Sequence, residues 1–465
     1  MTEHAVVVLG GGVAGLSAAL LLARDGHRVT LVERDPVEAS EPGDAFDAPR
    51  AGIPHFLQPH AFIPRGRSEL RRHLPDVLAA LLAVGASQVD MRPKLGGPAT
   101  KADEEIQYVA VRRPVIEWAL RQAALAQPRL VIRGDARVEG LDVVDGRVRE
   151  VRVDGGGVAC DLVVDALGRR TPTGEWLRAA GIAIAAPRTS DCGVVYYSRY
   201  YRCRPGFELP DGPWFLSPRG DLGYLAYASF PGDNRTFAAL LAVPNGVPEW
   251  KALHEASVFE AAVAQVPVLA SWVDPNGVDP LTPVLAMAGL HNSLRPGDGL
   301  SAAGVLPVGD AYGHTDPVLA HGMVFGLIHA AALAQSLREH EVVTEAGDAY
   351  LAATAPALEE RYALSSALDE QRHRMWTGGN VDFAHHDGDY ALFTIAAGGV
   401  AATTDPEIAR VFLRRIGLLD STRVLDDDVA MQQRIEAAFA AAAQMPRPRP
   451  GPSRAEMLAA IDRIT

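Results

Sequence analysis

Three glycines near the N-terminus have the spacing of a phosphate-binding turn. Gly10, Gly12 and Gly15 directly follow the apolar run 6–9. At this spacing the first glycine permits a tight turn after a buried strand, the second lets backbone amides approach a pyrophosphate, and the third lets the next helix pack closely. Glu33 ends the next apolar run, where a carboxylate accepts hydrogen bonds from an adenosine ribose. The pattern predicts a dinucleotide site, with FAD and NAD as alternatives because both carry adenosine diphosphate.

A second polar motif lies far along the chain, where Gly309 and Asp310 end an apolar run and His314 and Asp316 follow closely. An ionised Asp310 can only accept hydrogen bonds, which suits a ligand hydroxyl. A helix that begins near Gly322 would direct its amides and the positive end of its dipole toward the same place. We therefore expect this segment to form part of the ligand site.

The elements that must position these residues follow from the spacing of apolar residues. Helical spacing recurs after the glycine turn and in 66–85, and a proline in the first turn marks a helix that starts at Arg113. Short apolar runs predict a strand at 130–133 and a buried strand within 161–168. Asp145-Gly146, flanked by apolar alternation, predicts a hairpin turn.

The middle of the chain has a different pattern. Apolar and aromatic residues alternate from 192 to 243, which predicts antiparallel strands with turns at 218–220 and 231–233. The strand pattern of the first domain returns at 304–310, and helical patterns fill most of the remainder. Residues 445–452 read as a linker rich in proline and arginine that leads to a short docking helix.

These patterns predict an α/β protein. Its parts are a Rossmann-like nucleotide-binding domain, an inserted antiparallel β-sheet substrate domain and a mostly helical C-terminal region. The expected boundaries are 1–190 for the first part of the nucleotide-binding domain, 191–295 for the inserted sheet, 296–345 for the return segment and 346–465 for the helical region. A chain of 465 residues with 48% hydrophobic residues can bury the cores that this division needs.

Composition excludes several function classes. The net charge of −13 argues against nucleic acid and anionic membrane surfaces as partners. Apolar stretches fall short of the ~20 residues of a spanning helix, so no membrane span is expected. The chain enters its first strand without room for a signal segment, which predicts a cytoplasmic protein. Three cysteines without a Cys-x-x-Cys pair argue against structural zinc, and we expect no metal site.

Over most of residues 1–340 the chain resembles the flavoprotein monooxygenases of the para-hydroxybenzoate hydroxylase fold. The glycine turn, the helix start at Arg113 and the Gly309-Asp310 pair carry the resemblance. It implies FAD rather than NAD, because it pairs an early nucleotide turn with a late Gly-Asp, whose aspartate binds the ribityl chain while Arg113 reaches toward the phosphates or the ribityl. The implied FAD contacts are Gly10, Gly12, Val13, Ala14, Gly15, Glu33, Arg34, Arg113, Asp165, Gly168, Gly309, Asp310, Pro317, Gly322 and Met323.

Two segments are similar to polyketide-tailoring members of this group, including epoxidases of polyether pathways. They are residues 50–54 with His60, and residues 197–202. The similarity places Arg50 over the flavin, with a solvated loop arginine as the alternative. His314 and Asp316 are the polar groups expected near the flavin ring, and a histidine that only caps a helix is the alternative there. The candidate catalytic residues are therefore Arg50, His314 and Asp316.

Two departures from the family pattern bear on the chemistry. Where the family has Pro-x-x-Gly-x-Gly, this chain has Ala320 in place of the first of the two glycines, so the loop near the flavin is expected to sit differently. Where hydroxylases that bind NADPH have Asp-Gly, this chain has residues 165–168 as Asp-Ala-Leu-Gly. That variant leaves two routes for electrons from NAD(P)H, direct binding or a separate flavin reductase as partner.

The resemblance implies an FAD-dependent monooxygenase that inserts one oxygen atom from O2, by hydroxylation or epoxidation, into an apolar natural-product intermediate. Reduced flavin would form a C4a-hydroperoxide, and the protein would exclude water and aim the distal oxygen. The substrate is expected between the inserted sheet and the flavin. Its expected lining is Trp214, Phe215, Tyr224 and Tyr227, with sheet core as the alternative for each.

Three other functions remain open at this stage. A flavin-dependent halogenase shares the fold and the flavin motifs, but the chain has no Trp-x-Trp-x-Ile-Pro and no lysine in a halogenase context. A flavin-dependent reductase or saturase of isoprenoid chains is favoured by Ala320 and by the Asp-Ala-x-Gly variant. A non-catalytic, FAD-stabilised partner in a biosynthetic complex is the third alternative.

Overall fold

The computed structural model describes residues 2–36, 41–42, 46, 50–210, 218–379, 381, 390–444 and 450–464. At its centre lies a five-stranded sheet in the order β18-β9-β1-β2-β5, all of whose neighbours are parallel. The strands are β1 (Ala5–Leu9), β2 (Arg28–Val32), β5 (Leu130–Arg133), β9 (Leu162–Asp165) and β18 (Val305–Pro307). β1 and β9 are valine-rich and buried, as expected for strands covered on both faces. The predicted Rossmann-like core is confirmed.

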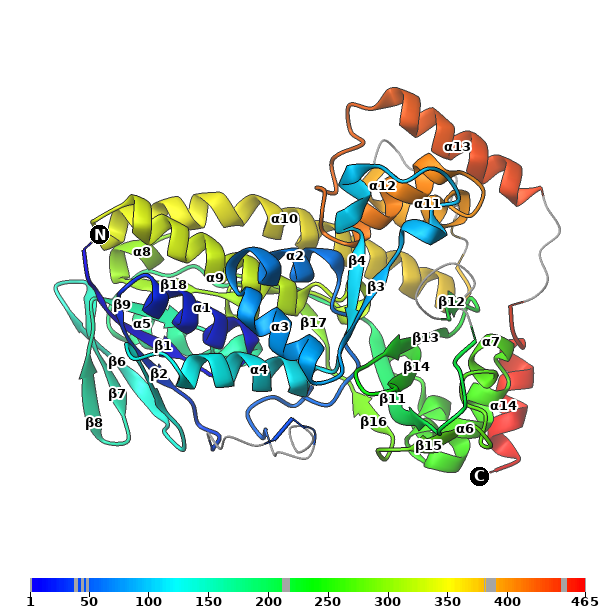
Figure 1. Ribbon diagram of the computed structural model, residues 1–465, viewed down its shortest axis with the longest axis horizontal. Helices are drawn as coiled ribbons and strands as arrows, with labels where there is room; N and C mark the ends of the chain where they lie inside the picture. The colour runs from blue at the N-terminus through cyan, green and yellow to red at the C-terminus, as the bar shows by residue number, and fades with distance from the viewer. Residues whose placement is uncertain are drawn as a thin grey trace.

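Helices that are distant in sequence pack together beside this sheet (Figure 1). α1 (Val13–Arg24) lies against both α4 (Arg113–Leu125) and α9 (Gly322–Glu339). The helix predicted over 66–85 is instead two helices, α2 (Pro64–His73) and α3 (Pro75–Ala83). Pro75 causes the break, because a proline disfavours helical backbone in the residue before it, and Leu74 is extended in φ at −138°.

The hairpin predicted at Asp145-Gly146 is confirmed. It joins β6 (Val138–Val144) to β7 (Arg147–Val153), and β8 (Gly156–Ala159) completes a three-stranded antiparallel sheet. Asp145 and Gly146 both have positive φ, 51° and 74°, as a tight two-residue hairpin turn requires.

The inserted sheet has the strand order β12-β13-β14-β11-β15, and β16 also pairs with β11. Its strands are β11 (Val194–Cys203), β12 (Arg219–Asp221), β13 (Ala226–Pro231), β14 (Thr236–Pro244), β15 (Val278–Pro280) and β16 (Leu285–Met287). The turn predicted at 231–233 is confirmed. The turn predicted at 218–220 is wrong, because these residues enter β12 and the chain reverses at Gly223 (φ 82°) instead.

Smaller elements join these parts. β3 (Ser87–Asp90) and β4 (Gln107–Ala110) form a hairpin, and β10 (Arg188–Asp191), β17 (His291–Leu294) and β19 (Gly313–His314) form a three-stranded sheet. The remaining helices are α5 (Thr173–Ala179), α6 (Ala256–Ala264), α7 (Pro267–Ala270), α8 (Leu300–Ala303), α10 (Val343–Trp376), α11 (Tyr390–Ala401), α12 (Pro406–Ile416), α13 (Val429–Ala443) and α14 (Arg454–Asp462).

The C-terminal helix docks on the inserted part of the molecule, as Figure 1 shows for α14 beside α6 and α7. Met457 and Ile461 of α14 belong to the core that Trp250 and α6 form there. Residues 445–449 of the predicted linker lie outside the described residues. None of the helices described combines the length and the apolar character that a membrane crossing needs.

Candidate functional site

The glycine turn has the shape that its spacing predicts. Gly10 has φ 98°, and a Cβ there would lie 2.7 Å from the carbonyl oxygen of Ala166. A Cβ at Gly15 would lie 1.9 Å from the carbonyl oxygen of Gly10, so only glycine allows the strand and helix to approach this closely. A Cβ at Gly12, by contrast, would meet no atom closer than 3.7 Å. The turn therefore opens at Gly12, where α1 begins without a side-chain cap.

The late Gly-Asp motif lies directly beside this turn. A Cβ at Gly309 would lie 2.8 Å from the Cβ of Ala14, and one at Gly322 would lie 3.4 Å from Oδ1 of Asp310. His329 of α9 fixes the loop, because its Nδ1 accepts a hydrogen bond from the Gly309 amide at 3.0 Å. The first turns of α1 and α9 and the Asp310 carboxylate therefore lie close together.

Two arginines add positive charge there. Arg169 Nε donates to Asp310 Oδ2 at 3.1 Å. Burial alone would raise the pKa of Asp310, but the Arg169 guanidinium lowers it to about 2, so this carboxylate is ionised. Arg113 begins α4, and a Cβ at Gly12 would lie 3.8 Å from its Nη2. Its Nε donates to Glu117 Oε1 at 2.9 Å, which holds the guanidinium near the turn.

Glu33 lies at the opposite end of the site, since β9 and β1 separate the strand that precedes it from the strand that precedes Asp310. Its Oε2 accepts from the Gly11 amide at 2.7 Å and from Arg50 Nη2 at 3.1 Å. Arg50 also lies within 3.6 Å of Asp35 and 3.5 Å of Glu117. Arg50 thus lies at the Glu33 end of the site. The alternative of a solvated loop arginine is wrong, because the Arg50 side chain is 2% exposed among three carboxylates.

Asp165 ends β9 and Gly168 lies in the loop that follows this strand, and Asp165 forms several hydrogen bonds within the protein. The Asp165 carboxylate accepts from the Leu167 amide at 3.1 Å, from the Thr171 hydroxyl and from Arg295 Nη1 at 3.2 Å. The Asp165 side chain is fully buried, and its hydrogen bonds hold the loop that carries Arg169. Gly168 has φ 75° in that loop. Arg34 donates to the carbonyl oxygen of Ala51 at 3.1 Å.

His314 follows Asp310 closely in space as well as in sequence. Its Nδ1 lies 3.1 Å from the carbonyl oxygen of Asp310, and its ring packs edge-on against His291. Burial lowers the pKa of His314 to about 4, so the imidazole is neutral near pH 7. Its Nε2 is buried and forms no hydrogen bond within the described residues. The ring therefore offers a neutral nitrogen beside the Asp310 loop.

Asp316 is held by several protein partners. Its carboxylate accepts from the Tyr196 hydroxyl, from Arg372 and from the Val318 amide, so it caps the short helix η7 (Pro317–Leu319). The Asp316 side chain is fully buried. We conclude that Asp316 anchors the loop between Asp310 and α9.

Sequence reasoning missed the residues that hold Asp316. Arg372 and Asp369 come from α10, and Asn292 accepts from the Asp316 amide while donating to Asp369 at 2.8 Å. Cys192, Asp316 and Asp369 place ligand atoms within 4.8 Å of one another, but the Arg372 guanidinium already pairs with both carboxylates. The spacing of Asp369 and Arg372, three residues apart on one predicted helix, is the one local signal that could have indicated an ion pair.

The inserted sheet has two faces with different partners. On β11, Tyr196, Ser198 and Tyr200 point toward the nucleotide-binding domain, since Tyr196 reaches Asp316 and Ser198 Oγ donates to Gln58 Oε1 at 2.9 Å. Tyr224 and Tyr227 belong to the core on the other face, with α6 and Trp250. Their expected place along the substrate is wrong. Trp214 and Phe215, also expected there, lie outside the described residues.

The face toward the nucleotide-binding domain carries a separate apolar cluster, here called the inner-face cluster. Tyr196, Leu240 and Ala242 of the sheet meet Trp376 at the end of α10. The buried members are Cys192, Val194, Tyr196, Leu240, Ala242, Leu290 and Trp376, with Ala226, Phe230, Met287 and Met375 packed against them. Period-two alternation in 194–201 predicts two such faces but does not say which one meets the cofactor domain.

The loop with the family departure keeps a glycine-type backbone. Ala320 has φ 57° and ψ 30°, which is the left-handed region that favours glycine. Pro317 begins η7, and Met323 is buried in the first turn of α9. We expected Ala320 to change the conformation of this loop. Instead, Ala320 adopts the left-handed conformation that glycine would adopt, at a cost in strain.

Comparison with known proteins relates the region of the glycine turn to FAD-dependent enzymes. Residues 5–88 match the family described as FAD dependent oxidoreductase. The chain is 29% identical over 462 residues to Protein Rv3254 of Mycobacterium tuberculosis, covering 90% of each. It is 33% identical over 175 residues to kynurenine 3-monooxygenase of Salinispora arenicola, covering 35% of this chain and 36% of that protein.

Solved structures share the fold at low identity. PqsL, a probable FAD-dependent monooxygenase from Pseudomonas aeruginosa, superposes with a TM-score of 0.59 at 16% identity over 81% of this chain and 99% of its own. A triple mutant of the flavin-dependent brominase Bmp2 gives 0.58 at 14% identity over 99% of both chains.

The glycine turn lies in the region that matches FAD dependent oxidoreductases, and the fold is one that solved flavin-dependent enzymes share. FAD is the cofactor that the matched family indicates. The residues fit it, because the open side of Gly12, the uncapped start of α1 and the ionised Asp310 lie close together, and Glu33 contacts the Gly11 amide of the same turn.

Proposed function

We propose that this enzyme transfers one oxygen atom from O2 to an apolar small molecule, by hydroxylation or epoxidation. The observation that carries the proposal is the close approach of Gly309 to Ala14, which brings the phosphate-binding turn and Asp310 together. Two proteins that this chain resembles support the proposal, because one is kynurenine 3-monooxygenase and the other, PqsL, is described as a probable FAD-dependent monooxygenase.

The chain's own residues would hold FAD at several points. Amides of Gly12, Val13 and Ala14 would face the pyrophosphate, Glu33 would accept from the adenosine ribose, and Arg113 and Asp310 would bind the middle of the molecule. Bound FAD would supply the redox chemistry that activates O2. Gly10, Gly15, Arg34, Pro317, Gly322 and Met323 shape the surrounding turns.

The protein's part in the reaction is to exclude water and to keep its buried nitrogens uncharged. Burial lowers the pKa of His60 to about 3, with help from the Arg113 guanidinium, and burial lowers that of His314 to about 4. A neutral imidazole can accept one hydrogen bond and donate another without adding charge. His314 is therefore our candidate for orienting a polar atom near Asp310.

The inner-face cluster supports an apolar substrate. Aromatic and aliphatic side chains from β11, β13, β14 and α10 meet there, next to the loop that Asp316 anchors. Such a lining binds mainly by removing apolar surface from water. We propose that electrons come from NAD(P)H, either directly or through a separate flavin reductase, and that the substrate is a natural-product intermediate.

Oxygen consumption tests the proposal. The purified, FAD-loaded enzyme is given NAD(P)H, with and without an added flavin reductase, and candidate apolar substrates under air and under argon. Substrate-dependent oxygen uptake together with a product that is heavier by one oxygen atom is the expected result. Reduction of the substrate under argon would assign the isoprenoid reductase alternative, and flavin that neither donor reduces would assign a non-catalytic role.

Halogenation is a second candidate, because the brominase Bmp2 matches almost the whole chain in fold. The lysines argue against it: Lys94, Lys101 and Lys251 are the only three in the sequence, and all are exposed. The same reaction in the presence of bromide distinguishes the two, since a halogenase would give a brominated product and an oxygenase the oxygenated one.

A further inference from the structure

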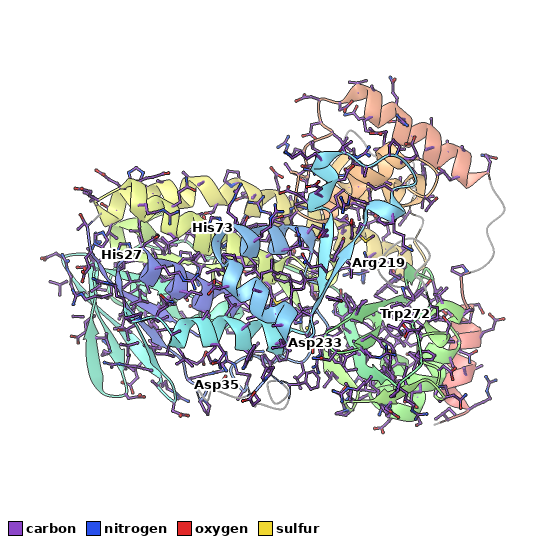
Figure 2. All side chains as sticks on the ribbon, in the orientation of Figure 1. His27, Asp35, His73, Arg219, Asp233 and Trp272 are labelled. Atoms are coloured by element: carbon purple, nitrogen blue, oxygen red, sulfur yellow. The ribbon has the colours of Figure 1, made fainter. Side chains whose placement is uncertain are left out.

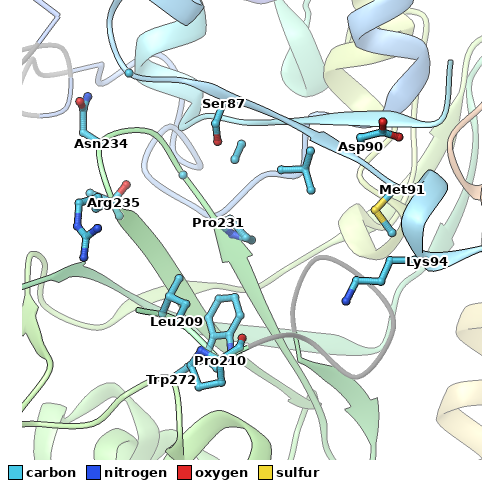
Figure 3. Close-up of a pocket in the computed structure, with 15 residues that line it drawn as sticks. Ser87, Asp90, Met91, Lys94, Leu209, Pro210, Pro231, Asn234, Arg235 and Trp272 are labelled. Carbon is cyan, nitrogen blue, oxygen red and sulfur yellow. The ribbon is translucent and has the colours of Figure 1, made fainter. Parts of the chain in front are cut away.

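A cavity of about 490 Å³ lies between the β3–β4 hairpin and the tip of the inserted sheet (Figure 3). We call it the interdomain cavity. Its walls come from β3, η2 (Arg92–Lys94), the turn between β13 and β14, and Trp272. This volume suits a small molecule, and such sites occur preferentially where domains meet.

The interdomain cavity is distinct from the flavin site. Trp272 belongs to the core on the outer face of the inserted sheet, together with Tyr201 and Phe237. Tyr196 and Tyr200, which lie on the opposite face of β11, point toward Asp316 and Gln58 instead. A ligand in this cavity would therefore lie at the end of the sheet and along its outer side.

A buried ion pair and an exposed side-chain hydrogen bond hold the walls of the cavity in place. Arg112, just before α4, donates from Nη2 to Asp233 Oδ2 at 2.7 Å and from its amide to Oδ1 at 2.9 Å. Asn234 Nδ2 donates to the carbonyl oxygen of Val84 at 2.9 Å. Asp233 lies where the inserted sheet meets the nucleotide-binding domain, on the side of Trp272 (Figure 2). The cavity is thus preformed, which reduces the ordering cost of binding.

The lining mixes apolar residues with the polar Ser87, Asn234 and Thr236 and with three charged residues, two of which are already paired. Asp90 is held by Arg92 through several hydrogen bonds, and Arg235 lies 3.3 Å from Glu208. Lys94 is exposed at the rim and has no ion-pair partner in the stretches of chain that the structure covers. Figure 3 shows its ammonium directed toward the same opening as Trp272. The apolar lining residues are Val89, Met91, Ala110, Leu209, Pro210, Pro231 and Trp272.

We propose that the interdomain cavity binds a small apolar molecule with a terminal carboxylate. The carboxylate would pair with Lys94, and the apolar body would pack between Met91, Leu209 and the indole of Trp272. The charge complementarity with one unpaired ammonium selects an anion over a neutral or cationic ligand. This site is independent of the reaction that the flavin supports.

Decanoate is the probe, and binding to the FAD-loaded protein is measured by titration calorimetry. We expect one saturable site that binds decanoate more tightly than decanol. Lys94→Met should weaken decanoate binding at least about threefold because the charge pair is lost. Ser87→Trp should abolish it, since Ser87 is an exposed strand residue at the cavity and the indole would fill the space.

Lys101→Met is the matched control, because Lys101 is exposed but does not line the cavity. The affinity of this variant for decanoate should equal that of the parent protein. Thermal unfolding of each variant shows that it folds. Absence of saturable binding overturns the proposal. An affinity that neither Lys94→Met nor Ser87→Trp changes also overturns it, because decanoate would then bind elsewhere. An effect of Ser87→Trp alone overturns it too, because Lys94 would then not pair with the carboxylate.

Discussion

Arg372 Nη2 lies 2.6 Å from Asp316 Oδ2, in an ion pair whose side chains are 11% and 0% exposed. The same guanidinium nitrogen lies 2.6 Å from Asp369 Oδ1 and donates to the carbonyl oxygen of Cys192. One side chain of α10 therefore joins the loop that leads to α9, the start of the inserted sheet and its own helix. This relationship fixes the loop before α9 to the start of the inserted sheet.

Removal of this guanidinium should destabilise the fold strongly. Arg372→Met leaves the buried, ionised Asp316 carboxylate without its cation, and we expect a loss of about 3–5 kcal/mol in the free energy of unfolding. Arg374→Met is the control, because Arg374 pairs with Glu370 on the exposed side of the same helix and should change stability by less than about 1 kcal/mol. Urea unfolding measures both. Equal effects of the two variants would contradict the anchoring role.

Asp369 should make stability depend on pH. Burial, together with the neighbouring Asp316 carboxylate, raises the pKa of Asp369 to about 8. A carboxyl group whose pKa is raised on folding stabilises the protein at low pH, and this stabilisation is lost as pH rises toward 8. Asp369→Asn cannot ionise, so its stability should fall less than that of the parent protein between pH 5 and pH 8. Unfolding curves at several pH values test this, and parallel pH profiles would refute it.

The open side of Gly12 gives a sharp test of the FAD site. Gly12→Val should fold normally, because its Cβ meets no protein atom closer than 3.7 Å, yet the protein should lose its yellow colour because the side chain occupies the pyrophosphate position. Gly156→Val, in the remote strand β8, is the matched control and should keep FAD. Visible absorption and thermal unfolding are recorded together. Full flavin occupancy in Gly12→Val would disprove the assignment.

Replacement of Ala320 by glycine should raise the free energy of unfolding. The left-handed conformation costs an alanine about 1–2 kcal/mol, whereas glycine adopts it freely but loses about 0.5–1 kcal/mol more chain entropy on folding. Ala320→Gly should therefore stabilise the protein by up to about 1 kcal/mol. Ala332→Gly, within the regular helix α9, should destabilise it by about the same amount. Thermal unfolding decides, and a loss of stability in Ala320→Gly would show that φ is not strained there.

Much of the nucleotide site was predictable because its signals are local. Gly10 and Gly15 are required by contacts between neighbouring elements, and the Asp145-Gly146 turn depends on two adjacent residues with positive φ. The break at Pro75 was also a local signal, and the prediction of one helix over 66–85 missed it. Backbone conformation within a few residues is what the sequence encodes most directly.

The rest of the site depends on contacts between distant segments. Arg50 could be recognised as a charged loop residue, but only the folded chain places it among Glu33, Asp35 and Glu117. The role of Asp316 likewise depends on Arg372, which lies on another helix. Charged side chains are long and can reach several partners, so their pairing is decided by the packing around them.

The sequence by itself determined a phosphate-binding turn with its acidic partner, a late Gly-Asp loop and the two faces of the inserted sheet, because each follows from short-range sterics and from alternation along a strand. Only the tertiary structure decided that Tyr196 faces Asp316 while Tyr224 and Tyr227 lie in the opposite core. Alternation specifies that a strand has two sides, and the docking of whole layers, driven by total apolar burial, specifies which side meets the cofactor domain.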